Sequence, residues 1–231
     1  MNTKYIGKCV ISGRVEQLLV AVPGRGSPYI RAVKEGSTKY PGCGKDVLDE
    51  MERHFPRVSP FPLPPEQRRA WRSSYVMLLD AFLQLPEHYG KLQLVFEYVM
   101  PQHNPAVQTG KPDIGVRADV LLLSKDTVCI LEFKDRPVLY PGAEKQARKY
   151  HRRLQRWHVE STGMNKKAVL VFTQMQRFHQ SAYRVEICSA DRLAKVIQQI
   201  FPPDFKRMTT EELKKWMASD WKTKDRYLKE K

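Results

Sequence analysis

The sequence contains no apolar run that approaches the roughly 18–20 residues needed to cross a bilayer. Its first 17 residues also lack the long apolar stretch of a secretory signal. The four cysteines, at positions 9, 43, 129 and 188, form no Cys-x-x-Cys pair. Their spacing disfavours both a zinc site and a disulfide framework. We therefore expect reduced thiols, a cytoplasmic location and no membrane partner.

Acidic residues are scarce relative to basic ones. The 231 residues include 40 Lys and Arg against 25 Asp and Glu, a formal net charge of +15. Such an excess favours a polyanionic partner, and nucleic acid comes first because no basic amphipathic segment stands alone as a membrane anchor. A basic surface that serves only solubility is the alternative. Hydrophobic residues make up 42% of the chain, which argues against global disorder and predicts a packed core.

Proline is concentrated in one place, because five of the 16 prolines fall within residues 56–65. Proline has no backbone donor and restricts the residue before it, so this stretch predicts an extended connector. We place a domain boundary there. The interpretation is an N-terminal extension over 1–58, with a strand pair around Gly13 and a short helix at 46–55. A core over 59–200 and a basic C-terminal helical tail over 201–231 follow.

Hydrophobic periodicity predicts the elements of the core. Helices are expected over 66–85, 143–157 and 189–200, and strands over 91–100, 117–123, 127–134 and 167–173. A polar loop at 101–116 separates the first two strands. Thr209 and Glu212 have the spacing of a capping box, which predicts the start of a further helix. This order is typical of an α/β domain with a central mixed sheet flanked by helices.

The strands at 117–123 and 127–134 follow one another so closely that they predict a hairpin. If Lys125-Asp126 alone forms the loop, Asp119 lies directly opposite Glu132, with roughly 5 Å between their Cβ atoms. Lys-Asp is not a favoured two-residue hairpin loop, so this register is a hypothesis.

Apolar runs at 120–123 and 128–131 surround these acids. A carboxylate at the end of a strand buried on both faces loses hydration, and two close carboxylates repel each other. A divalent cation such as Mg²⁺ or Mn²⁺ relieves both costs. We therefore predict Asp119 and Glu132 as metal ligands. Lys134 shares a face with Glu132 and is predicted to assist the attacking water. The alternative is a structural ion pair at the sheet edge.

Glu97 lies in the predicted strand at 91–100 and is a third acid among apolar neighbours. If this strand is adjacent to the hairpin, Glu97 joins the same cluster as a further catalytic residue. A solvent-facing glutamate on an alternating strand is the competing interpretation, and the sequence favours neither.

The predicted helix at 143–157 carries six Lys or Arg residues against one acid. Gln146, Tyr150 and Arg153 are spaced i, i+4 and i+7 and therefore share one stripe. Together with Lys149, they are predicted to contact a phosphate backbone without reading base sequence. The alternative is a solvated basic face with Tyr150 packed into the core.

These residues together resemble the PD-(D/E)XK nuclease superfamily. Asp119, followed after twelve residues by Glu132-Phe133-Lys134, matches its acidic motif, and Gln146-x-x-x-Tyr150 resembles the QxxxY element of its RecB-like branch. The segment 96–101 is similar to a strand in the nuclease-like segment that precedes some bacterial helicases. Ala118 departs from the pattern, which has proline there; the literal Pro112-Asp113 lies in the polar loop.

The resemblance covers residues 66–175 and implies a restriction-endonuclease-like core. It implies a metal-dependent deoxyribonuclease that acts on single- or double-stranded DNA, with Mg²⁺ or Mn²⁺ as cofactor. A non-catalytic nucleic-acid-binding subunit of a helicase/nuclease complex, or an RNA nuclease, is the alternative. A helicase or ATPase partner and a homodimer are both compatible with these features. Gly42-Cys43-Gly44-Lys45 does not complete a P-loop, because Lys39 and Asp46 replace its glycine and its serine or threonine.

Overall fold

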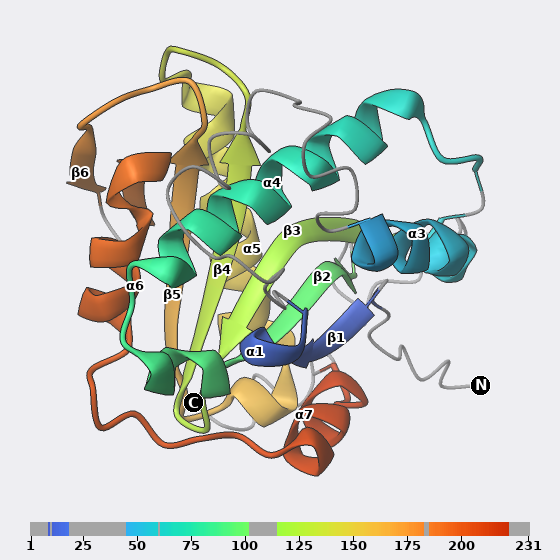
Figure 1. The fold of residues 1–231 in the computed structure, drawn as a ribbon. Coiled ribbons are helices and arrows are strands. Elements are labelled where there is room, and N and C mark those ends of the chain that lie inside the picture. The colour runs from blue at the N-terminus through green and yellow to red at the C-terminus, as the bar shows by residue number, and fades with distance from the viewer. Residues whose placement is uncertain are drawn as a thin grey trace.

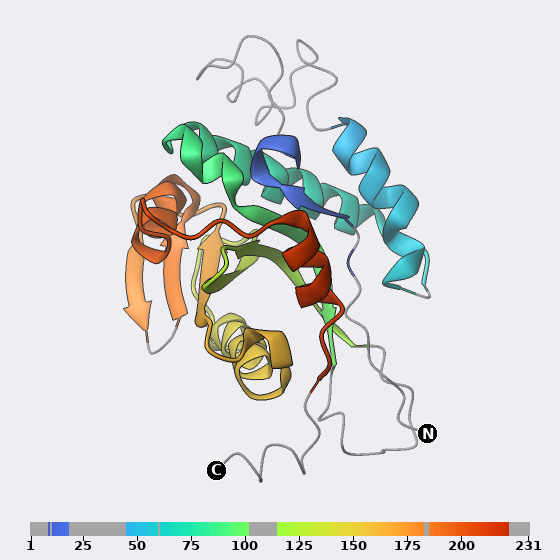
Figure 2. The same ribbon diagram turned by 90° about the horizontal axis from the view of Figure 1, so that it is seen from below.

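The computed structural model describes residues 9, 11–18, 45–59, 61–101, 115–182 and 185–221. A seven-stranded mixed sheet forms the centre, and helices cover both of its faces (Figures 1 and 2). The predicted α/β fold, with a central mixed sheet between helices, is confirmed. Helices of 3-10 type, η1 to η4, connect some of these elements; they span Phe55–Arg57, Glu87–Lys91, Val159–Ser161 and Ala190–Arg192.

The sheet has the strand order β1-β2-β3-β4-β5-β7-β6. The first four strands form antiparallel pairs, β5 runs parallel to both β4 and β7, and β6 is antiparallel to β7. The strands are β1 Ile11–Arg14, β2 Gln93–Met100, β3 Val116–Leu123, β4 Thr127–Lys134, β5 Asn165–Phe172, β6 His179–Ala182 and β7 Val185–Ser189. β4 and β5 are the inner strands joined by a helical crossover, as parallel neighbours require.

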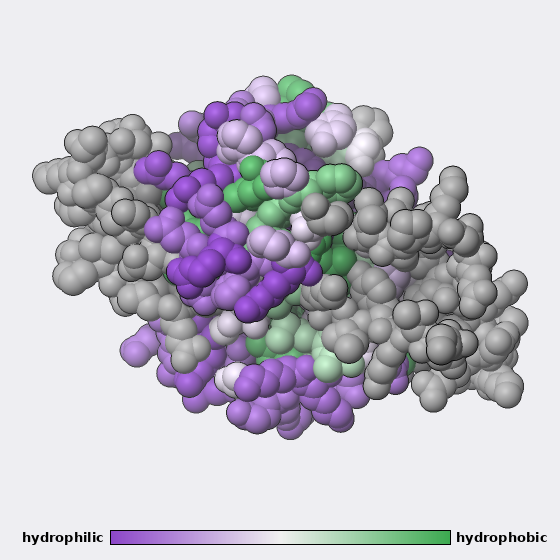
Figure 3. All heavy atoms as spheres, turned by 90° about the vertical axis from the view of Figure 1, so that its right-hand side faces the viewer, coloured by the Kyte–Doolittle hydropathy of each residue, from purple (hydrophilic) through white to green (hydrophobic). Residues whose placement is uncertain are grey.

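Two apolar layers lie on opposite faces of the sheet. Helices α3 (Lys45–His54), α4 (Pro65–Leu83) and α6 (Leu193–Ile200) pack on one face. Helices α5 (Pro141–Trp157) and α7 (Thr210–Met217) pack on the other. The short α1 (Val15–Leu18) follows β1. On the face seen in Figure 3, mostly hydrophilic described residues border a band of apolar ones.

The β3–β4 hairpin has the predicted two-residue loop. The pairs from Leu123–Val128 to Val120–Leu131 have the predicted register. Side chains explain why Lys125-Asp126 suffices as the loop: Ser124 Oγ donates to Asp126 Oδ1 at 2.7 Å, and the Thr127 N–H donates to Ser124 Oγ at 3.1 Å. These bonds replace the glycine that such a turn usually needs.

Helix beginnings follow local chemistry. α4 and α5 each have proline in their first turn, where the missing N–H costs nothing. The capping box at Thr209 and Glu212 is present at the start of α7. No helix of the described residues is long and apolar enough to cross a membrane. Cys9, Cys129 and Cys188 are free thiols, and Cys43 lies outside the described residues.

The structure differs from the sequence-based predictions in two respects, and two predicted segments lie outside the described residues. The strand pair around Gly13 is wrong in part, because β1 ends at Arg14 and the chain continues as a helical turn. β1 instead pairs with β2, so residues before 58 extend the central sheet. β6 and β7 were not expected. The loop interior at 102–114 and the tail beyond 221 lie outside the described residues.

Candidate active site

Asp119 and Glu132 come together at one end of the β3–β4 hairpin. The ladder's last pair is Val120 with Leu131, so the next residues in register are Asp119 and Glu132. Asp119 Oδ2 accepts a 2.8 Å hydrogen bond from the backbone N–H of Phe133. This bond fixes the Asp119 carboxylate beside the strand that carries Glu132, as the sequence predicted.

Glu97 extends this pair into a row of three acids on three adjacent strands. The register between β2 and β3 is given by the flanking pairs, Phe96 with Val120 and Tyr98 with Ala118. Glu97 therefore lies across from Asp119. Its side chain is only 2% exposed, which rules out the solvent-facing alternative.

The pleat of both strands is interrupted at this row. On β2, Val95 and Tyr98 face the same apolar layer although they are three positions apart, and on β3 Ala118 and Leu121 do the same. Strict alternation would send each pair to opposite faces. Glu97 accommodates the irregularity with a φ of +54°, which is uncommon for a residue other than glycine. Such backbone strain is concentrated at functional sites.

A chain of hydrogen bonds leads from Glu132 to helix α5. Lys134 Nζ donates to Glu132 Oε1 at 2.8 Å and to Gln146 Oε1 at 3.0 Å. Gln146 Nε2 donates to the Tyr150 hydroxyl at 2.7 Å, and that hydroxyl donates to the Arg117 carbonyl at 2.8 Å. Gln146 and Tyr150 therefore orient Lys134 and the backbone of β3.

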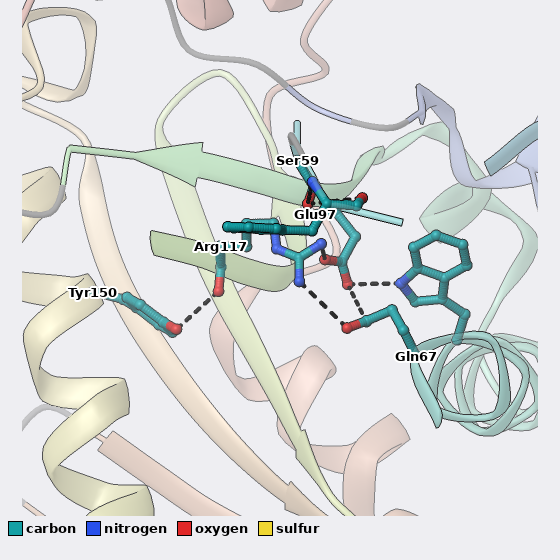
Figure 4. A network of polar contacts seen from close by, with 7 residues as sticks. Ser59, Gln67, Glu97, Arg117 and Tyr150 are labelled. Carbon is teal, nitrogen blue, oxygen red and sulfur yellow. Dashed lines mark hydrogen bonds and ion pairs between the residues drawn. The ribbon is translucent and has the colours of Figure 1, made fainter. Parts of the chain in front are cut away.

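A second network holds Glu97 on the α4 side of the sheet (Figure 4). Glu97 Oε1 accepts from Trp71 Nε1 at 2.8 Å and from Gln67 Nε2 at 3.2 Å. Arg117 Nη1 lies 3.1 Å from Glu97 Oε2, an ion pair without the alignment of a hydrogen bond. The Arg117 guanidinium also lies over the Phe55 ring, 5.1 Å from its centroid. Both carboxylate oxygens of Glu97 are thus occupied within the protein.

Burial raises the pKa values of all three acids, and repulsion by a neighbouring carboxylate adds to this for Glu97 and Glu132. Burial, followed by the charge of Asp119, raises the pKa of Glu97 to about 7. Burial likewise raises the pKa of Asp119, and burial with the charge of Asp119 raises the pKa of Glu132 well above its ordinary value. Burial alone would lower the pKa of Lys134, but the charges of Glu132 and Asp119 outweigh it and keep the ammonium protonated.

The three acids line a cleft of about 180 Å³ between α4 and the ends of the strands. Its lining includes Gln67, Trp71, Glu97, Asp119, Glu132 and Lys134. Buried acids with raised pKa values in a cleft are typical of functional sites.

The donor set suits a hard divalent cation that keeps part of its hydration shell. Glu132 Oε2 is buried and accepts no hydrogen bond, and no described residue donates to Asp119 Oδ1. Mg²⁺ usually takes one or two carboxylates, with waters and substrate phosphates completing its shell. Among the described residues, no group of three or more His, Cys, Asp or Glu is placed to hold a metal ion. Asp119 and Glu132 could therefore hold Mg²⁺ as a pair. Both carboxylate oxygens of Glu97 already have partners within the protein.

The predicted nucleic-acid contacts on α5 are in two different environments. Tyr150 is 4% exposed and Arg153 Nε donates to the Pro101 carbonyl at 2.9 Å, so this stripe faces the protein. Lys149 is exposed. It belongs to an exposed basic stripe formed by Lys145, Lys149, Arg152 and Arg156.

Sequence reasoning missed Gln67 and Trp71 as partners of Glu97. One signal was present, because Gln67 and Trp71 are spaced i, i+4 on one face of a helix. A polar residue on that apolar face indicates a buried hydrogen-bond partner, but the periodicity does not identify Glu97. Arg117, the cationic partner of Glu97, was not predicted either.

No protein-family model matches this chain, and no curated protein matches it. Among solved structures, the chain is similar to the crystal structure of protein VC1899 from Vibrio cholerae, at 13% identity and a TM-score of 0.35. That alignment covers 80% of this chain and 48% of the other, so this chain spans about half of its length. A likeness at this level supports no inference about function.

Proposed function

We propose that this protein is a metal-dependent deoxyribonuclease that hydrolyses phosphodiester bonds in DNA. The observation that carries the proposal is a row of three acids that line one cleft, with Glu97 and Glu132 buried, Asp119 partly buried and Lys134 bonded to Glu132. A net charge of +15 and the exposed basic stripe on α5 supply attraction for a polyanion. The resemblance of Asp119, Glu132-Phe133-Lys134 and Gln146-x-x-x-Tyr150 to the PD-(D/E)XK motifs supports the same chemistry.

Asp119 and Glu132 would hold Mg²⁺ or Mn²⁺ in this proposal. A bound ion of this kind supplies a nucleophilic water at neutral pH and stabilises charge on the phosphate. Lys134, whose ammonium donates to Glu132 Oε1 at 2.8 Å, would orient the water and offset developing charge on the phosphate. Gln146 fixes that ammonium through the 3.0 Å bond, and Tyr150 fixes Gln146. Glu97 stabilises the neighbouring strand through Arg117.

A non-catalytic nucleic-acid-binding subunit is the second candidate. The observation in its favour is that two of the three acids already have a cationic partner, Lys134 for Glu132 and Arg117 for Glu97. A purely structural cluster would be neutralised in this way. The unpaired Oε2 of Glu132 favours the enzyme, because a buried acceptor without a partner costs stability and a structural cluster gains nothing from it.

The test is a cleavage assay on end-labelled single-stranded DNA, double-stranded DNA and RNA, each with Mg²⁺, Mn²⁺ or EDTA. We expect DNA cleavage that requires the metal and falls by about a hundredfold or more in Glu132→Gln, which preserves shape and removes the charge. Glu66→Gln is the matched control, because Glu66 is an exposed residue on α4 that pairs with Arg69.

Each other outcome decides against a specific part of the proposal. Salt-sensitive DNA binding without cleavage in any metal favours the binding subunit. Cleavage of RNA alone overturns the DNA specificity. Metal-dependent cleavage that survives Glu132→Gln overturns the assignment of the site.

A further inference from the structure

A loop, residues 135–140, joins β4 to α5 beside the candidate active site. It projects beyond the edge of the sheet at which β4 ends (Figure 1). Asp135 Oδ1 accepts hydrogen bonds from Thr173 Oγ1 at 2.7 Å and Gln174 Nε2 at 3.0 Å, which tie the loop's start to the end of β5. The Arg136 guanidinium lies 5.3 Å from the centroid of the Tyr140 ring, so this contact connects the beginning and the end of the loop.

The tip of this loop is apolar and exposed. Val138 is 62% and Leu139 38% exposed. Within the described ranges, the third large hydrophobic residue of comparable exposure is Phe61, at 66%. Pro137 precedes the tip, and the fixed φ of proline limits how far the backbone can fold inward. The loop therefore presents two adjacent aliphatic side chains to solvent.

Along the chain, the tip of the loop is only a few residues from the candidate active-site residues on β4. Val138 follows Lys134 by four residues, and Asp135 lines the cleft itself. α5 begins directly after the loop and carries Gln146 as well as the exposed basic stripe. The loop thus lies, along the chain, between the cleft residues at the end of β4 and the basic stripe on α5.

We propose that Val138 and Leu139 contact the face of an unpaired base next to the phosphate in the cleft. This inference rests on the proposed nuclease function. Nucleic acid is the occupant whose chemistry matches the surroundings, because it combines an anionic backbone with apolar base faces. The cation Arg136 precedes the tip, and Lys145 and Lys149 are exposed on the helix that follows it, which suits such a backbone. Apolar side chains that wedge against bases are a general device of DNA-binding proteins. Two aliphatic side chains are too small an area to anchor the protein to a membrane.

The test compares two DNAs that differ only in bases. One is a short duplex with an unpaired thymidine tail, and the other is the same duplex with an abasic tail of equal length. Binding of the full chain is measured by fluorescence anisotropy in EDTA, so that no cleavage occurs. We expect Val138→Ser/Leu139→Ser to weaken binding to the thymidine tail by about three- to tenfold, a smaller loss than removing an aromatic stacking partner. Binding to the abasic tail should not change.

Phe61→Ser is the matched control, because it removes an equally exposed apolar side chain from a different segment, the one that precedes α4. An equal loss on both DNAs, or no loss on either, overturns the base contact. A serine variant with wild-type binding, in a protein that still cleaves DNA, overturns the loop's role and leaves the nuclease intact. Wild-type protein that neither binds nor cleaves either DNA overturns both proposals.

Discussion

The Tyr150 hydroxyl on α5 donates a 2.8 Å hydrogen bond to the backbone carbonyl of Arg117 on β3. The side chain of the same arginine reaches the α4 side of the sheet, where it pairs with Glu97 and donates a 3.3 Å hydrogen bond to Gln67 Oε1 (Figure 4). Arg117 therefore joins the two helical layers through the sheet, two residues before Asp119. The position of Asp119 depends on contacts from both sides.

Removing the Tyr150 hydroxyl should separate its bonding role from its packing role. Tyr150→Phe leaves the Arg117 carbonyl and the Gln146 amide without their partner, so the free energy of unfolding should fall by about 1–2 kcal/mol. Urea denaturation measures this change. Tyr140→Phe is the control and should change it by less than about 0.5 kcal/mol, because Tyr140 is only partly buried. An equal loss in both variants would show that the hydroxyl bond has no particular role.

Removing Arg117 should leave the buried Glu97 charge without its cation. At pH 8, Arg117→Met should lower the free energy of unfolding by about 2–4 kcal/mol, less than a fully buried pair would lose because Arg117 is partly exposed. The double variant Glu97→Gln/Arg117→Met should recover much of that loss, because no buried charge remains. A double variant with additive losses would contradict the pairing.

Stability without metal should depend on pH through Glu97. Its pKa is about 7 in the folded protein and near the ordinary 4.5 in the unfolded chain. The folded state therefore binds more protons between these values, and the free energy of unfolding falls as pH rises through this window. Relative to Glu97→Gln, the wild-type protein should lose roughly 3 kcal/mol between pH 4.5 and pH 8. Urea titrations in EDTA at several pH values measure it, and a difference that is flat with pH would contradict the raised pKa.

Mg²⁺ should stabilise the folded protein by neutralising the acids. At a concentration about a hundredfold above its dissociation constant, it should add about 2.7 kcal/mol, and less at acidic pH because protons compete for the carboxylates. Thermal melts with Mg²⁺ and with EDTA measure the shift. Asp119→Asn should abolish it, whereas Asp204→Asn, at an exposed position, should retain it. An equal Mg²⁺ shift in both variants would place the ion elsewhere.

Local patterns in the sequence determined much of this fold. Periodicity located α4, α5 and the strands β2 to β5, because their apolar positions repeat over two or more turns or a full buried run. The short loop at Lys125-Asp126 then set the register, because two residues leave no freedom in how the strands pair. The juxtaposition of Asp119 with Glu132 was therefore readable from the sequence. β6 and β7 were not, because they are short and β6 is largely exposed, so neither carries a strong pattern.

Tertiary structure alone decided what surrounds the acids. The left-handed backbone at Glu97 depends on the strands on either side of it, and its donors Trp71 and Gln67 are 26 and 30 residues away in the chain. Burial and the charge of Asp119 raise the pKa values of Glu97 and Glu132. Both causes arise only after the sheet and the helices have packed together. The sequence thus determined which acids share a hairpin, because that is a local property. Their charge and orientation were decided by packing, because desolvation and long-range hydrogen bonds require the whole fold.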